Sequence, residues 1–151
     1  MIEFPEGYVR ALTDEIIEQS LPNLRPSENF EFSSLQDEDY NCVAWASGRD
    51  DGWTQFYDAS GRAIRTPERY VQHFLEMGYD EVSPNGDFEN GINKIAIYIN
   101  TNRNHFKHVA RQLPNGKWAS KLGDWEDIEH SSAEDLLGFY GDKIIYLQKI
   151  I

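Results

Sequence analysis

The sequence predicts an α+β fold in which helices come first and an antiparallel sheet follows. Two observations carry this prediction: apolar residues over 66–78 recur with a helical period, whereas those over 95–99 alternate as in a strand. Helices and strands that are segregated along a chain favour α+β over alternating α/β. The 151 residues suit a single domain, with an N-terminal helix and loop over 1–37 and a core over 38–151.

Helix signals mark the N-terminal half of the chain. They fall on residues 7–20, 42–47 and 66–78, and the polar, proline-bearing stretch 23–38 is predicted as a surface loop. Asp39 or Asn41 can cap the second helix. Thr66 followed by Pro67 is a typical start for the third, which Gly78 stops.

Strand signals occupy the C-terminal half. They fall on residues 95–99, 108–113, 117–122 and 143–149. The run 114–116 (Pro-Asn-Gly) predicts a tight turn that joins the second and third of these strands into a hairpin. Ser131 and Glu134 have the spacing of a capping box, which predicts a short helix ending near Gly138.

Charge and composition exclude several classes of partner. The chain carries 14 Lys and Arg against 26 Asp and Glu, a formal charge of −12, which repels nucleic acids and anionic membrane surfaces. A basic protein partner fits this charge, as does a role in solubility alone. The sequence contains neither an apolar run long enough to span a bilayer nor a secretory signal, so we expect a cytoplasmic protein, although export by a dedicated secretion system is compatible with the sequence.

The only cysteine, Cys42, is a candidate nucleophile. A cap at Asp39 or Asn41 would place it in the first turn of a helix, where free backbone N–H groups lower a thiol pKa and can hold an oxyanion. Among the four histidines, His108 opens a predicted strand whose rigid backbone could aim the ring at that helix, so it is the first candidate for the base.

A third polar group would orient the imidazole. Ser120 lies beyond the hairpin turn and can face His108, with Asp124 and His130 as competitors. Gln36 could contribute to the oxyanion hole, and Lys121 could bind a carboxylate or phosphate. Each of these roles has a structural alternative. Cys42 could be a buried core residue, and Gln36 and Lys121 could simply be solvated.

Several short motifs resemble an uncharacterised bacterial domain family over about residues 38–150. They are YNCVAWA (40–46), KIAIY (94–98), HVARQL (108–113), SKLG (120–123) and DIEH (127–130). At greater distance, Tyr40, Asn41 and Cys42 before a helix and His108 on a strand resemble the papain-like NlpC/P60 and CHAP amidases. This resemblance implies a papain-like fold with N-terminal helices packed on a C-terminal antiparallel sheet, and it places the third catalytic position on Ser120, where those families carry His, Asn or Gln.

Two functions follow as alternatives. The first is a thiol-dependent hydrolase or deamidase that acts on a peptide or amide bond of a peptide or protein substrate, through a dyad or triad of Cys42, His108 and Ser120, with neither metal nor cofactor. The second is a non-catalytic acidic binding protein, for example of the immunity type, on a papain-like scaffold. The reactivity of the Cys42 thiol separates them.

Overall fold

A computed structural model of the chain describes residues 2–37, 41–47, 54–83, 85–123 and 125–151. The candidate cap Asp39 and the candidate site residues Tyr40 and Asp124 lie outside these ranges.

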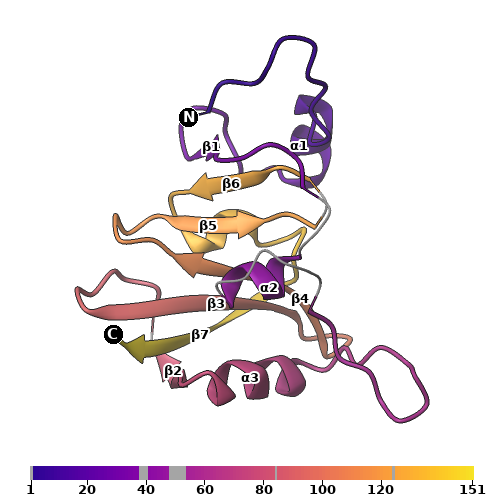
Figure 1. Ribbon diagram of the computed structural model, residues 1–151, viewed down its shortest axis with the longest axis vertical. Helices are drawn as coiled ribbons and strands as arrows, with labels where there is room; N and C mark the ends of the chain where they lie inside the picture. The colour runs from indigo at the N-terminus through magenta and orange to yellow at the C-terminus, as the bar shows by residue number, and fades with distance from the viewer. Residues whose placement is uncertain (1, 38–40, 48–53, 84, 124) are drawn as a thin grey trace.

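The described residues combine a few short helices with one large sheet (Figure 1). The helices are α1 (Asp14–Ser20), α2 (Cys42–Ala46), α3 (Pro67–Glu76) and the 3-10 helix η1 (Ala133–Leu136). The strands are β1 (Phe30–Phe32), β2 (Asp80–Ser83), β3 (Ile92–Asn100), β4 (His105–Gln112), β5 (Trp118–Lys121), β6 (Asp127–His130) and β7 (Lys143–Ile150). They follow the order β1-β6-β5-β4-β3-β7-β2, and every neighbouring pair is antiparallel, so the predicted α+β class is confirmed.

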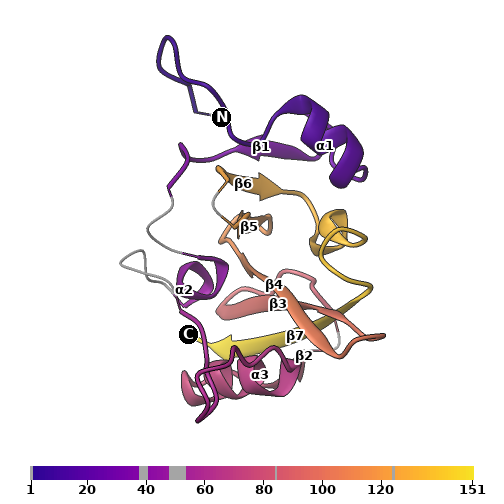
Figure 2. The ribbon, with the colours of Figure 1, turned by 90° about the vertical axis from the view of Figure 1, so that its right-hand side faces the viewer.

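The sheet has two covered faces, because successive residues of a strand point to opposite sides. On one face, which we call the α2 face, Ile97 and Val109 share an apolar cluster with Val43 of α2 and Phe74 of α3. On the other, the α1 face, the cluster runs from Tyr98 and other sheet residues to α1 and η1, its members including Ala110, Ile17 and Leu136. Figure 2 shows α2 on one side of the sheet and the segment that contains η1 on the other.

The starts of α2 and α3 agree with the sequence signals. The Asn41 side-chain oxygen accepts a hydrogen bond from the Ala44 N–H at 3.0 Å, which satisfies a donor that the first turn leaves free. Thr66 precedes α3 and Pro67 occupies its first turn. Gly78 follows α3 with a φ of 96°, a conformation that a glycine adopts without steric cost.

The N-terminal part of the prediction needs two corrections. The first helix begins at Asp14 rather than near Gly7, because Thr13 caps it, and Val9, which lies within the predicted range, is 83% exposed. The predicted loop over 23–38 contains strand β1, which pairs with β6 through Phe30 and His130. A strand of three residues is too short to show its alternation in a polar stretch.

Four further elements, from β2 onward, differ from the prediction. Strand β4 begins at His105, three residues earlier than expected, and β6 and β2 were missed as strands. The capping box is formed by Ser132 and Asp135 instead of Ser131 and Glu134, and it starts a 3-10 helix rather than an α-helix. Both pairs have the same spacing, and only the path of the backbone after β6 selects between them.

The segment before α1 is attached to the sheet through the buried carboxylate of Glu126. Its two oxygens accept hydrogen bonds from the Tyr8 hydroxyl at 2.7 Å and from the N–H groups of Ala11 and Leu12 at 2.9 and 2.8 Å. Burial acts to raise the pKa of this carboxyl, but the hydrogen bonds outweigh it and the pKa is lowered. Within the described ranges, no helix has the length and apolarity that a membrane crossing requires.

Candidate functional site

Cys42 is the first residue of α2 and lines a cavity of about 350 Å³ on the α2 face. The thiol is half-buried, and desolvation raises its pKa to about 11. The backbone N–H groups of Val109, Val43 and Cys42 and the charge of Lys121 act in the opposite direction, without cancelling the effect of burial. A thiol with this pKa is protonated at neutral pH and is therefore a poor nucleophile.

The ring of His108 lies on the α1 face, opposite to Cys42. It stacks on Tyr140 with ring centroids 4.3 Å apart and contacts Tyr98, which belongs to the α1-face cluster. Its neighbour Val109 points the other way and packs with Val43. The structure thus places β4 itself between the sulfur and the imidazole, and the predicted contact of Cys42 with His108 is not formed. The catalytic role of each residue stays a prediction.

His108 belongs instead to a buried polar chain with Ser120 and His130. The distance from His108 Nε2 to Ser120 Oγ is 3.0 Å, and that from Ser120 Oγ to His130 Nε2 is 2.7 Å. His130 Nδ1 is 2.8 Å from the carbonyl oxygen of Ser132. All three side chains are at most 1% exposed. As expected from the sequence, Ser120 faces His108, and His130 lies next to Ser120. All three side chains lie on the face of the sheet away from Cys42.

The donor and acceptor in each of these hydrogen bonds follow from the contact of His130 with the Ser132 carbonyl. A carbonyl oxygen can only accept, so His130 Nδ1 carries the proton, and Nε2 of the neutral ring is an acceptor. Ser120 then donates its hydroxyl proton to His130 and accepts from the protonated Nε2 of His108. If both rings were protonated, both Nε2 atoms would donate to Ser120, and the Ser120 hydroxyl proton would have no acceptor among these groups.

Burial keeps both rings neutral. Desolvation lowers the pKa of His108 to about 3, with a further contribution from the charge of His130. Desolvation also lowers the pKa of His130 to about 4, although Ser132 and Asp135 favour its charged form. An imidazole with a pKa near 3 is a weak base at neutral pH, which is unfavourable for proton transfer from a thiol.

Lys121 lies on the α2 face but is already engaged. Its ammonium donates to the carbonyl of Trp125 at 2.7 Å and lies 3.7 Å from the Asp127 carboxylate, and its side chain is wholly buried. Lys121 is therefore paired within the chain, and its use for an external carboxylate or phosphate stays a prediction.

The supporting residues near Cys42 have structural contacts. Asn41 caps α2 and also binds Thr54, accepting from its N–H at 3.1 Å and donating to its carbonyl at 2.9 Å. Gln36 is exposed, its N–H donates to the Tyr8 hydroxyl, and it is not among the residues that line the Cys42 cavity. The structure brings Asn41 to Cys42, as the sequence predicts, but not Gln36.

The sequence reasoning missed His105 as a residue of the Cys42 cavity. His105 lines the Cys42 cavity together with Lys107, Arg65 and Tyr70. An expected strand start at His108 leaves His105 in the preceding turn and outside the set of candidate site residues. The earlier start of β4 is the feature that carries His105 to this cavity. Among the described residues, no three His, Cys, Asp or Glu side chains group as a metal site.

The comparisons with known proteins give a family and nothing more specific. Residues 31–148 match the family model described as "Domain of unknown function (DUF7689)". Neither a curated protein nor a solved structure matches the chain. The resemblance to an uncharacterised domain family is thereby confirmed, whereas the papain-like resemblance receives no support. Since the match covers most of its length, the chain belongs to the DUF7689 family.

Proposed function

We propose that this protein is a non-catalytic binding protein whose partner is basic. The observation that supports this choice over a hydrolase is the position of His108, whose ring is hydrogen-bonded to Ser120 on the α1 face while Cys42 lies on the α2 face. A thiol with a pKa of about 11 and an imidazole with a pKa of about 3 are each unsuited to their catalytic step at neutral pH.

The charge of the chain supports the choice of partner. A formal charge of −12 on 151 residues attracts cationic surfaces, accelerates their encounter with the protein and repels acidic ones. Association driven in this way weakens as salt screens the charges.

The reactivity of Cys42 with iodoacetamide tests the non-catalytic part. We expect the native protein at pH 7.5 to react at least tenfold more slowly than a free cysteine derivative, because its thiolate population is smaller. The rate should still be rising at pH 9, and the His108→Gln variant should have the same pH profile. A midpoint below pH 8 that this variant shifts upward would contradict the proposal.

Binding to peptide libraries tests the partner. We expect the protein to retain arginine- and lysine-containing peptides at low salt, to release them as salt rises, and to ignore a library in which Glu replaces the basic positions. Equal retention of both libraries, or of neither, would refute a basic partner. Circular dichroism at each salt concentration is the control for folding.

A papain-like thiol hydrolase is the second candidate, with His105 in place of His108. It is favoured by the shared cavity of Cys42 and His105 and by the N–H groups of Val43 and Val109 directed at the sulfur. Substrate entry that ordered His105 next to the thiol would lower the thiol pKa. The same alkylation experiment tests it: His105→Gln should slow the reaction at pH 7.5 while His108→Gln should not, and equal rates would exclude it.

A further inference from the structure

A second cavity, of about 430 Å³, lies on the α1 face near η1 and combines aromatic rings with carboxylates. Its walls include Phe88, Trp118, Tyr146, Asp87 and Glu134. None of its lining residues is Lys, Arg or His, although the chain has 14 Lys and Arg. An exposed aromatic ring beside acidic groups, in a cavity without an internal cation, is suited to a cation with a flat apolar surface.

The aromatic part of the cavity is built from the sheet. Trp118 of β5 and Tyr146 of β7 have ring centroids 5.9 Å apart, and the segment that contains Gly86 passes directly over them. A Cβ atom on Gly86 would lie 2.8 Å from the Tyr146 ring and 3.1 Å from the Trp118 ring, so only glycine allows this close approach. Phe88 adds a ring that is 47% exposed.

Two carboxylates, those of Glu134 and Asp87, line the same cavity as these rings. Glu134 accepts a hydrogen bond from the Tyr146 hydroxyl at 2.8 Å, and both Glu134 and Asp87 act on that hydroxyl electrostatically. The Glu134 carboxylate is largely in solvent, because the residue is exposed and the Tyr146 hydroxyl binds only one of its oxygens.

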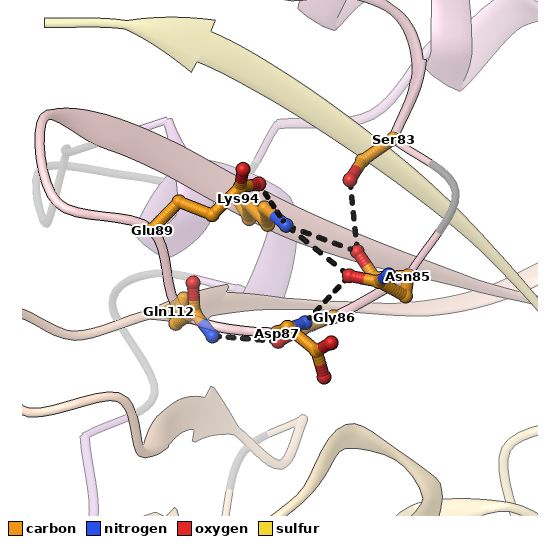
Figure 3. A network of polar contacts seen from close by, with 7 residues as sticks. All are labelled: Ser83, Asn85, Gly86, Asp87, Glu89, Lys94 and Gln112. Carbon is orange, nitrogen blue, oxygen red and sulfur yellow. Dashed lines mark hydrogen bonds and ion pairs between the residues drawn. The ribbon is translucent and has the colours of Figure 1, made fainter.

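Lys94, which binds the segment that contains Asp87, is already paired with another carboxylate. The Lys94 ammonium is 2.7 Å from the Glu89 carboxylate and also donates to Asn85. Figure 3 shows the Asp87 carboxylate pointing away from Lys94, while its backbone N–H binds the Asn85 side chain. The polar network on this segment therefore fixes the backbone and leaves the Asp87 carboxylate to the cavity.

We propose that this cavity binds an arginine side chain of the basic partner, with the guanidinium stacked on the exposed ring of Phe88 and hydrogen-bonded to Glu134 and Asp87. A guanidinium is planar, weakly hydrated and forked, so it can stack and pair with a carboxylate at once, whereas an ammonium is a strongly hydrated point charge. This assignment rests on the proposed binding function and names its recognition site.

Titration of the full chain with N-acetyl-arginine methylamide tests the site by NMR. The readout is the indole N–H resonance of Trp118, which a Trp118→Phe variant identifies. We expect a saturable shift with the arginine probe and at least tenfold weaker binding of the citrulline analogue, its uncharged isostere. Citrulline or lysine analogues that bind as tightly as arginine would overturn the assignment.

Single variants separate the cavity from the overall charge. Glu134→Gln and Asp87→Asn should each weaken the arginine probe at least fivefold, and Phe88→Ala should do the same without any change in charge. Glu68→Gln, on the exposed surface of α3, removes the same charge elsewhere and should leave binding unchanged. If Glu134→Gln and Glu68→Gln weakened binding of the arginine probe equally, net charge alone would explain the loss, and the assignment of the site would be overturned.

Failure of the cavity assignment can be distinguished from failure of the proposed binding function. If the basic peptide library is retained by the wild type and equally by the Glu134→Gln variant, the cavity assignment fails and the binding function stands. If the wild type retains no basic peptide, the proposed function itself fails, whatever the single arginine probe does.

Discussion

Replacement of Ser120 by alanine should be among the most destabilising single changes in this protein. The hydroxyl both accepts from His108 and donates to His130, so its loss leaves a buried donor and a buried acceptor without partners. Each unpaired buried group costs about 1–3 kcal/mol, so we expect the free energy of unfolding to fall by about 2–6 kcal/mol. Urea unfolding at pH 7.5 measures this loss.

Ser131→Ala is the matched control, because Ser131 is exposed and donates to the Asn29 carbonyl through its backbone N–H rather than its side chain. We expect it to change stability by less than about 0.5 kcal/mol. A Ser120→Ala variant as stable as this control would mean that the two rings find other partners, and would contradict the directional chain described above.

Mild acid should destabilise the protein through the same two histidines. Burial lowers the pKa to about 3 for His108 and about 4 for His130, whereas both rings titrate near 6.5 in the unfolded chain. Between these limits the unfolded chain binds protons that the folded one does not. Stability is therefore complete above pH 6.5 and is lost as the pH falls, by about 2 kcal/mol per ring at pH 5.

Urea midpoints at pH 7.5 and pH 5 test this expectation. The His130→Gln variant keeps a polar side chain but cannot titrate, so the difference between the two conditions should shrink to about half that of the wild type. His105→Gln, which removes a histidine from the start of β4, should leave the difference unchanged. A wild type equally stable at both pH values would show that the rings are charged in the folded protein.

Features that depend only on neighbouring residues agree with their prediction, whereas features that depend on distant parts of the chain do not. Asn41, Thr66, Pro67 and Gly78 act within one helical turn, and their predicted roles as starts and stops agree with the structure. The capping box moved by one residue because two pairs with equal spacing were available, and the path of the chain after β6 decided between them. Strand β1 gave no signal because three residues carry too little alternation.

The candidate site shows the same division. The sequence by itself determined the α+β class, the N-terminal position of Cys42 in α2 and the facing pair of His108 and Ser120, since each follows from local caps, periods and a hairpin turn. Only the tertiary structure decided which face of the sheet each side chain occupies. In a strand a shift of one residue reverses that face, and the register that sets it depends on distant strands. For that reason His108 lies with Tyr140, while the neighbouring Val109 lies with α2.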